Sequence, residues 1–236
     1  LIPRAVPEIL SARLSSRTDG ADGIVDVELE LAAPVASATA QCDNGFATLA
    51  SAGDNRYIGS LRLALVERWF PHTHGAPRLY EISATIDGES LVLGRVGFRE
   101  IELDRGADGL GFALLVNGVA VFCRGAVWMP LDPVSLQNDS ALLARTIALA
   151  KEAGVNMLRV GATGAYETDS FYRVCDAAGI LVWQDFMFSN FDYPAADPGF
   201  VASVENEARQ FLKRTSGSPA LAVLCGGNEV YQQAAM

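Results

Sequence analysis

The stretch NMLRVGATGAYETDSFYRVCDAAGILVWQD, residues 156–185, places one apolar run at each end of a helical pattern. The two runs are short and almost wholly apolar, which is typical of strands buried on both faces of a sheet. The pattern between them opens at Thr168 or Asp169, either of which can cap a helix, and it stops at Gly179. A strand, a helix and a second strand in this order predict a parallel β-α-β unit.

The same alternation extends to both sides of this unit. Asp139 or Ser140 can cap an earlier helix that Gly154 stops, and Asp197-Pro198 opens a later helix with an apolar stripe. Four strands joined by three helices fit either an open doubly wound sheet or a (β/α)8 barrel, because right-handed crossovers build both. The expected strands cover residues 121–128, 156–160, 180–183 and 220–225.

Residues 7–98 follow a different period. Runs such as GIVDVELEL and LYEISATI alternate apolar and polar residues, and clusters of turn-forming residues separate them. About seven antiparallel strands in this range predict a β-sandwich of immunoglobulin-like size. Further on, Asn117-Gly118 predicts the tight turn of a hairpin. The expected fold class is a multidomain β and α/β protein, with an immunoglobulin-like β-sandwich in residues 1–98 and the parallel unit in residues 99–236.

The composition limits the partners of this protein. Its 236 residues include 28 acids and 18 bases, for a net charge of −10, and no cluster of Lys or Arg could follow a phosphate backbone. We therefore expect neither nucleic acid nor an anionic membrane surface as a partner. No apolar run approaches the ~20 residues that cross a bilayer. Two prolines and Glu8 stand near the start, where a secretion signal has its apolar core. A soluble protein is expected, with the cytoplasm favoured as its compartment.

Neither the cysteines nor the histidines form a metal-binding pattern. The four cysteines lie far apart among apolar neighbours, which predicts buried free thiols rather than disulfides or zinc ligands. His72 and His74 stand between prolines without a third ligand nearby, so structural hydrogen bonding is expected. No glycine-rich phosphate loop follows any expected strand. The sequence therefore predicts no metal and no cofactor.

The residues that can carry chemistry gather where the expected strands end. In either parallel architecture, sites form at the carboxyl ends of the strands. Aromatic rings, amides and carboxylates suit an uncharged ligand rich in hydroxyl groups, because rings cover its apolar faces and polar groups bind its hydroxyls. The residues at these ends are Trp128 and Asp132, then Arg159, Tyr166 and Glu167, then Trp183, Gln184 and Asp185, and finally Asn228 and Glu229.

Five motifs are specific enough to compare with known families. They are ERWFPHTHGAPRLY (67–80), GFREIELD (97–104), VNGVAVFCRGAVWMPLD (116–132), YETDSFYRVCDAAGILVWQDFMFSNFDYP (166–194) and CGGNE (225–229). In this order they resemble the β-mannosidase branch of glycoside hydrolase family 2. The resemblance implies an immunoglobulin-like domain followed by a partial (β/α)8 TIM barrel of about four β/α units. It also implies retaining hydrolysis of terminal β-linked sugars, with a β-mannoside or a related β-glycoside as the carbohydrate partner.

The resemblance implies roles for three polar residues. Glu229 matches the general acid/base of the family, and Asn228 matches the amide that holds the 2-hydroxyl of the sugar. A carboxyl at the mouth of an apolar strand is expected to be shielded from water, which suits a proton donor. Arg159 matches an arginine that supports the catalytic nucleophile, although from its residue type alone it could instead neutralise a buried acid.

Trp128, Trp183 and Asp185 fall in motifs that line or support the sugar pocket in the family, so they are expected to bind substrate. From residue type alone, each tryptophan could instead belong to the core, and Asp185 could cap the loop that follows it. Glu167 and Asp169 are expected to be acids at the amino terminus of a helix.

The chain is expected to be inactive alone. Retaining hydrolysis needs two carboxyl groups about 5 to 5.5 Å apart, and the family resemblance places the nucleophile on a later barrel strand than those in this sequence. A half-barrel also has an open sheet edge, through which the chain is expected to self-associate. The alternative is a non-catalytic carbohydrate-binding or assembly module derived from a glycosidase.

Overall fold

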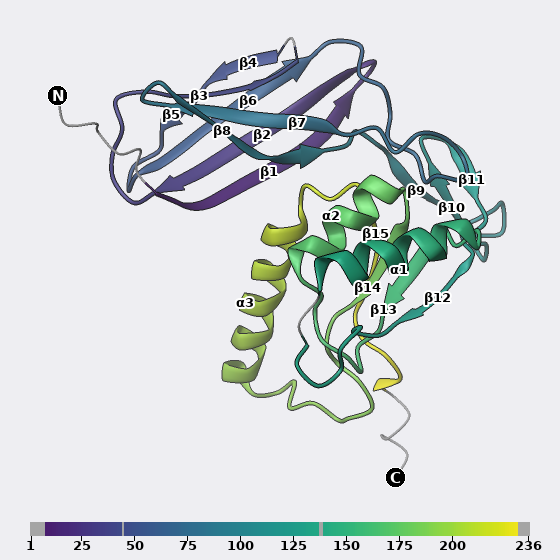
Figure 1. The fold of residues 1–236 in the computed structure, drawn as a ribbon. Helices are drawn as coiled ribbons and strands as arrows, with labels where there is room; N and C mark the ends of the chain where they lie inside the picture. Colours follow the sequence, from purple (N-terminus) through teal and green to yellow (C-terminus); the bar gives the residue numbers. More distant parts are fainter. Residues whose placement is uncertain (1–7, 44, 137–138, 231–236) are drawn as a thin grey trace. The chain divides into compact units, whose positions relative to one another are not determined.

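The structure is a computed structural model that describes residues 8–43, 45–136 and 139–230 (Figure 1). Within these ranges the chain forms three antiparallel sheets, one parallel sheet and three α-helices. None of these helices is long and apolar enough to span a membrane. The predicted combination of an all-β part and an α/β part is confirmed.

The chain folds as two compact units. The first combines the described residues up to 68 with 78–100, and the second combines 69–77 with the described residues from 101 onward. The segment 69–77 lies inside the range 1–98 that the sequence assigns to the first domain, yet it packs within the second unit. A single cut in the sequence therefore does not separate the two units.

The first unit is a β-sandwich of two four-stranded antiparallel sheets. The strands of one sheet lie in the order β1-β2-β6-β5, and those of the other lie in the order β4-β3-β7-β8. Both sheets contribute apolar residues to one buried core. The strands are β1 (Ile9–Asp19), β2 (Asp22–Leu31), β3 (Ala38–Cys42), β4 (Gly45–Thr48), β5 (Ala50–Ser51), β6 (Arg56–Leu63), β7 (Tyr80–Ile86) and β8 (Glu89–Val96).

The period-2 pattern of β2 shows how this core forms. Val25, Val27 and Leu29 are at most 2% exposed, while the residues between them are only partly buried. They share the core with Ile82 of β7. The predicted antiparallel strands are confirmed, although the described residues hold eight strands where about seven were expected. The difference arises because the segment 45–51 pairs with one sheet through β4 and with the other through β5.

Three short strands belong to the start of the second unit. β9 (Ile101–Asp104), β10 (Ala113–Val116) and β11 (Val119–Val121) form an antiparallel sheet in the order β11-β10-β9. Asn117 and Gly118 have positive φ angles of 53° and 75°. A two-residue hairpin turn needs this backbone conformation at both positions. The predicted turn is therefore confirmed.

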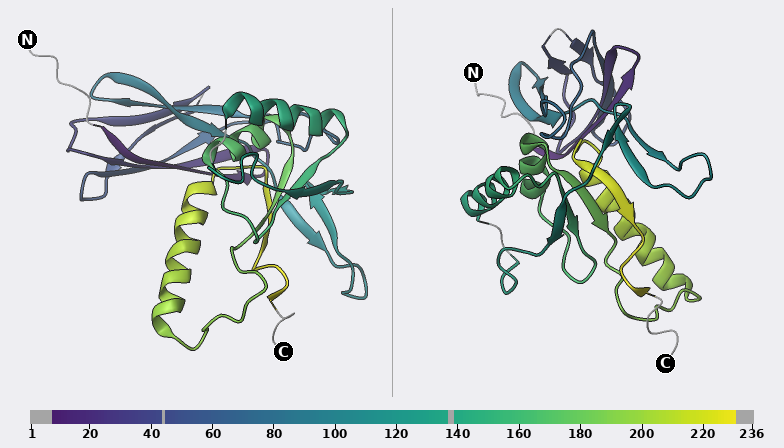
Figure 2. Two further views of the ribbon diagram at one scale, coloured as in Figure 1. Left: turned by 60° about the horizontal axis from the view of Figure 1, so that its bottom comes forward. Right: turned by 90° about the vertical axis from the view of Figure 1, so that its right-hand side faces the viewer.

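The parallel sheet follows the predicted alternation of strands and helices (Figure 2). Its four strands lie side by side in chain order, β12-β13-β14-β15, and each neighbouring pair is parallel. One helix lies in each of the three connections. The elements are β12 (Gly125–Trp128), α1 (Ser140–Glu152), β13 (Met157–Val160), α2 (Asp169–Ala178), β14 (Leu181–Asp185), α3 (Pro198–Thr215) and β15 (Leu221–Cys225).

The helix ends follow their sequence signals. The Asp139 carboxylate caps α1 by accepting from two backbone N–H groups, and Asp197 caps α3 by accepting from Gly199 N at 2.8 Å. Thr168 is the amino-terminal cap residue of α2, and Gly179 ends that helix with a φ of 72°. Glycine adopts this left-handed conformation without the steric cost that a side chain brings.

The single strand expected over residues 121–128 is wrong, because β11 and β12 are separate elements. The buried side chain of Asn156 holds the residues between them. Its Oδ1 accepts from Arg124 N at 2.7 Å, and its Nδ2 donates to Phe122 O at 3.0 Å. These bonds, made from more than 30 residues away, end the antiparallel hairpin and start the parallel sheet. The mostly apolar sequence of residues 121–128, interrupted only by Arg124 and Gly125, does not by itself reveal this change.

All four cysteines are free, as expected, but their burial differs. Cys42 and Cys175 are buried, Cys225 is half-buried and Cys123 is exposed. Burial raises the pKa of the Cys42 thiol to about 11, so this thiol stays protonated near neutral pH. The expected burial is wrong for Cys123, because that residue lies in the irregular connection before β12 rather than within a strand.

Candidate active site

The carboxyl ends of β13, β14 and β15 bring three of the predicted residues together. Arg159 lies on β13, Asp185 ends β14, and Asn228 follows β15. The Arg159 guanidinium donates to Asp185 from Nε at 3.1 and 3.2 Å and from Nη2 at 2.7 Å. Nη2 also donates to Asn228 Oδ1 at 3.0 Å. Arg159 therefore links the ends of three neighbouring strands.

Asp185 is the buried member of this cluster. Its side chain is 0% exposed and also accepts a hydrogen bond from Ala162 N at 3.3 Å. The hydrogen bonds and charge of Asp185 raise the pKa of Arg159 above its ordinary value, so the guanidinium remains charged. Arg159 thus neutralises a buried acid, one of the two possibilities that its residue type leaves open. Since these bonds engage its carboxylate, Asp185 orients Arg159, and its contact with a substrate stays a prediction.

Glu229 follows the cluster directly, and its side chain is exposed. The expectation that the mouth of the strand shields this carboxyl is wrong for the described residues, because residues 188–190 contact Gly227 and Asn228 but leave the Glu229 side chain exposed. The φ angle of Glu229 is 55°, in a left-handed region that residues other than glycine rarely adopt. Such conformations cost about 1 to 3 kcal/mol and concentrate at functional sites. Other described residues such as Leu65 and Asn117 share this conformation, so the catalytic role of Glu229 stays a prediction.

The two predicted tryptophans lie on opposite faces of the parallel sheet. Trp128 is in register with Val160 and Trp183 with Arg159, and successive residues of a strand point to opposite faces. Trp128 is 7% exposed and packs against Phe171 of α2, with ring centroids 5.1 Å apart. The Trp183 ring lies 5.3 Å from the Arg159 guanidinium. Trp128 therefore supports the strand end from the helical side, whereas Trp183 faces the polar cluster.

We expect Trp128→Phe to destabilise the chain more than Trp183→Phe, by about 1 to 3 kcal/mol. Trp128 Nε1 donates to the buried Glu167 Oε1 at 2.8 Å, and the phenylalanine ring cannot replace that donor. Trp183 Nε1 has no hydrogen-bond partner within the described structure. Trp128→Phe therefore leaves the Glu167 carboxylate without this donor, whereas Trp183→Phe removes no hydrogen bond of the described structure. Urea denaturation measures the free energy of unfolding of both variants. An equal loss in the two variants would contradict the difference between the two indole environments.

Two buried polar residues behind the cluster form a further link. Tyr172 Oη donates to Gln184 Oε1 at 2.6 Å, and Gln184 Nε2 donates to the carbonyl of Asp185 at 2.8 Å. Burial raises the pKa of the Tyr172 phenol, so it remains a donor at neutral pH. The sequence places Gln184 at a strand end but does not identify Tyr172, because its aromatic ring fits the apolar face of a helix equally well.

The two acids expected at the start of a helix have different roles. Asp169 lies in the first turn of α2, as expected, and pairs with Arg214 at 3.1 Å. Glu167 precedes the cap residue of that helix, and it is 3% exposed and accepts the Trp128 hydrogen bond. Glu167 thus stands at the amino terminus of the helix, as expected, and it also binds the Trp128 indole. No local signal distinguishes the two acids, because the partner of Glu167 lies 39 residues away.

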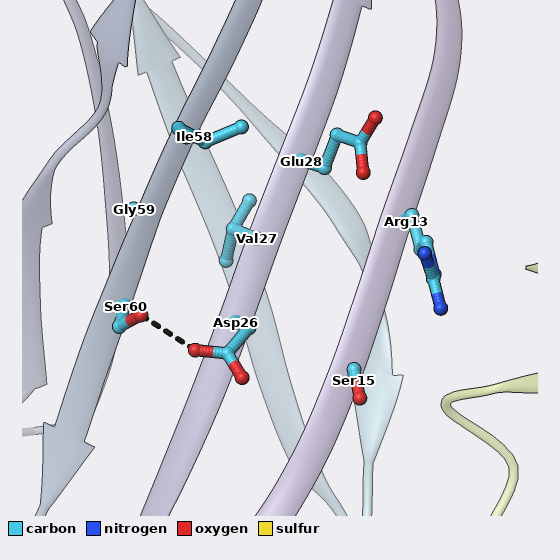
Figure 3. A pocket seen from close by; sticks show the side chains of 8 residues that line it. All are labelled: Arg13, Ser15, Asp26, Val27, Glu28, Ile58, Gly59 and Ser60. Carbon is cyan, nitrogen blue, oxygen red and sulfur yellow. Dashed lines mark hydrogen bonds between the residues drawn. The ribbon is translucent and has the colours of Figure 1, made fainter. Parts of the chain in front are cut away.

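Two hollows of the described structure are lined by none of Arg159, Asp185 and Asn228. A groove of about 560 Å³ on the first unit includes Asp26 and Glu28 (Figure 3). Asp26 accepts from Ser60 Oγ at 2.5 Å and Glu28 from Arg56 at 2.7 Å, so both carboxylates are already engaged. An apolar cavity of about 460 Å³ lies in the second unit and is lined by Phe112, Leu114, Phe122, Met157, Trp183 and Val223, among others. The strand-end cluster is therefore the stronger candidate for chemistry.

The histidines make structural hydrogen bonds, as expected. His72 Nε2 lies 2.8 Å from the carbonyl of Val155, and His74 Nδ1 lies 2.8 Å from Thr73 Oγ1. In the described ranges, no three His, Cys, Asp or Glu side chains are grouped so that they could hold a metal ion.

The fold of the chain occurs in solved glycosidases. A β-glucuronidase from Parabacteroides merdae matches 92% of this chain with a TM-score of 0.75 at 17% sequence identity, over 29% of its own length. At that identity the likeness concerns the fold alone. A β-D-mannosidase from Dictyoglomus thermophilum matches 94% of this chain with a TM-score of 0.75 at 30% identity, again over 29% of its own length. The chain thus has the fold of a segment of these enzymes.

Sequence comparison gives the particular branch. β-Mannosidase B of Aspergillus terreus (strain NIH 2624 / FGSC A1156) is 38% identical over 170 residues, which are 70% of this chain and 20% of that protein. No family model matches the chain. The chain spans about a fifth of the length of this curated relative. It is related to the β-mannosidase branch of glycoside hydrolase family 2, which confirms the resemblance of its motifs.

Proposed function

We propose that the whole protein is a retaining glycoside hydrolase that cleaves terminal β-linked sugars, with a β-mannoside as the first candidate substrate. The observation that carries this proposal is the cluster of Arg159, Asp185 and Asn228 at the ends of three parallel strands, with Glu229 next in the chain. Charged and amide groups beside an aromatic ring suit a ligand rich in hydroxyls. The names of the relatives support the same chemistry.

The order of the parallel strands supports a (β/α)8 TIM barrel. A doubly wound sheet reverses its strand order at a switch point. The strands β12 to β15 instead follow one another in chain order, as barrel strands do. We therefore propose that residues 99–236, joined by the segment 69–77, form the first half of a barrel. The rest of residues 1–98 would form an immunoglobulin-like domain.

In this proposal Glu229 is the general acid/base. It first donates a proton to the oxygen of the leaving group, and it later removes a proton from the attacking water. Its exposed side chain leaves room for the sugar to approach. Asn228 binds the 2-hydroxyl, and the charged Arg159 supports the second carboxylate. That carboxylate would lie about 5 to 5.5 Å from the carboxyl of Glu229 and attacks the anomeric carbon of the sugar.

We propose that the chain is inactive alone, because the other acids at the strand ends are engaged within its described part. Asp185 is held by Arg159, and Glu167 accepts from the Trp128 indole. Asp132 accepts hydrogen bonds from its own loop. The nucleophile would then come from a residue outside this chain.

Hydrolysis assays on the full-length protein and on this chain test the proposal. We expect the full-length protein to hydrolyse an aryl β-mannoside faster than the matching β-glucoside or β-glucuronide. Proton NMR should show the β-anomer as the first product, since retention places the new hydroxyl where the leaving group was. We expect this chain to hydrolyse none of the three. A full-length protein without activity on any of them, or a product of inverted configuration, would overturn the proposal.

The partners follow from the same proposal. Calorimetry of the full-length protein with mannose and mannobiose should show binding, and binding without turnover of any glycoside would favour a carbohydrate-binding or assembly module. Val127 on β12 and Leu224 on β15 are 57% and 46% exposed. Apolar side chains beside an unpaired strand edge favour association, so we propose that the isolated chain self-associates, which sedimentation velocity can test.

A further inference from the structure

Residues 188–190 follow β14 and are here called the 188–190 segment. This segment makes hydrogen bonds to both the N–H and the carbonyl of Asn228. Asn228 N donates to Phe188 O at 2.8 Å, and Asn190 N donates to the carbonyl of Asn228 at 3.3 Å. Ser189 lies opposite Asn228 in an isolated parallel bridge. The connection after β14 therefore fixes the backbone of Asn228, the member of the cluster that follows β15.

Gly227 makes this close approach possible. A Cβ at position 227 would lie 2.7 Å from Phe188 O and 3.1 Å from Phe188 Cβ. The first distance is shorter than ordinary contacts, so any side chain at this position would displace the segment. At the neighbouring Gly226, nothing lies within 4 Å of such a Cβ. Neither glycine has a positive φ angle, so position 227 requires glycine for space and not for backbone freedom.

Tyr193 fixes the 188–190 segment from its other side. Its Oη accepts from Ser189 N at 2.8 Å and donates to the carbonyl of Ser189 at 3.3 Å. Its ring packs edge-on against Phe188, with centroids 4.9 Å apart, and stacks on Phe200 of α3 at 6.0 Å. Ser189 is only 8% exposed. The segment is therefore anchored to the scaffold rather than free to follow Asn228.

These contacts orient the side chain of Asn228. Its Oδ1 accepts from Arg159 Nη2 at 3.0 Å, and its Nδ2 lies 3.5 Å from Ser189 Oγ. An amide has one acceptor oxygen and one donor nitrogen, so a bond from a cation assigns the oxygen to the Arg159 side. The nitrogen carries two hydrogens, and the long contact with Ser189 leaves a donor for a ligand.

We propose that the 188–190 segment is a positioning element that holds the Asn228 amide as a donor to the 2-hydroxyl of the sugar. Gly227 leaves the space that the segment occupies, and Tyr193 anchors the segment. The ligand in this proposal rests on the proposed function. The segment acts through Asn228 and need not touch the sugar itself.

Gly227→Ala and its matched control Gly226→Ala test the proposal in the full-length protein. The readout is kcat/KM for an aryl β-mannoside divided by kcat/KM for its 2-deoxy analogue, which lacks the hydroxyl that Asn228 is proposed to bind. We expect Gly227→Ala to lower this ratio about 2- to 12-fold, the range for loss of one hydrogen bond. Gly226→Ala should change it by less than about 2-fold. Tyr193→Phe keeps the ring and should lower the ratio in the same direction as Gly227→Ala.

The side-chain amide signals of Asn228 in the NMR spectrum of the chain give a second readout that needs no activity. We expect Gly227→Ala and Tyr193→Phe to shift these signals, and Gly226→Ala to leave them in place. Unshifted signals in the first two variants would overturn the proposal whatever their kinetics.

Two kinetic outcomes also overturn it. One is an equal fall in kcat/KM for the β-mannoside and its 2-deoxy analogue, which indicates general destabilisation. The other is an unchanged ratio although the Asn228 signals move. If the wild-type protein hydrolyses neither substrate, the proposed function fails while the NMR readout still decides whether the segment positions Asn228. The two failures are thus distinguishable.

Discussion

Replacing Glu229 with glutamine in the full-length protein is expected to lower kcat/KM for an alkyl β-mannoside by about 10²- to 10⁴-fold, the usual contribution of a general acid. The amide keeps the size of the side chain but has no proton to give to the leaving oxygen. The loss should shrink as the leaving group becomes more acidic, because a nitrophenolate departs without a proton. Initial rates over a series of leaving groups measure this dependence.

Glu205→Gln is the matched control for Glu229→Gln. Glu205 is an exposed acid on α3, so its loss makes the same change of charge away from the strand ends. Its rates should stay within about 2-fold of the wild type, as expected for a surface change. A Glu229→Gln variant that keeps its rate on the alkyl substrate would remove Glu229 from the mechanism.

Replacing Trp69 with alanine is expected to lower the free energy of unfolding of the second unit by about 3 to 5 kcal/mol. Trp69 is 0% exposed, and its Nε1 donates to the carbonyl of Asp176 at 2.8 Å. Its own carbonyl accepts from Asn117 Nδ2 at 2.9 Å. Alanine would leave a large cavity and one buried acceptor without its donor, so both packing and hydrogen bonding are lost.

Hydrogen exchange resolved by residue measures this effect, since a chain with two compact units need not unfold in one step. Amides of α2 and β13 should lose protection in Trp69→Ala, whereas those of β2 should keep it. His74→Ala is the control: this exposed residue of the same segment should cost no more than about 0.5 kcal/mol. A greater loss of amide protection in β2 than in α2 would contradict the assignment of Trp69 to the second unit.

Most secondary structure could be predicted because its signals are local. The alternation of β2, the glycine that ends α2 and the Asn117-Gly118 turn each depend on residues a few positions apart. The resemblance of the motifs is confirmed by the β-mannosidase relatives. The alternating order of strands and helices also predicts that the candidate residues meet, since parallel strands present their carboxyl ends at the same edge.

The cluster itself could be predicted only in part. Arg159, Asp185 and Asn228 were expected at neighbouring strand ends, but the sequence does not say that Asp185 lies buried under Arg159. The pairing depends on strand register, and a shift by one residue would turn a side chain to the opposite face. The same register separates Trp128 from Trp183.

By itself, the sequence determined the order of strands and helices, the family relationship and the residue types at the strand ends, because these are encoded within short windows. Only the tertiary structure decided that the segment 69–77 packs in the second unit, that Glu229 is exposed, and that the 188–190 segment holds Asn228. Each of these depends on contacts between residues far apart in the chain, or on their absence. Local propensity carries no information about such contacts, because it acts only over neighbouring turns of the backbone.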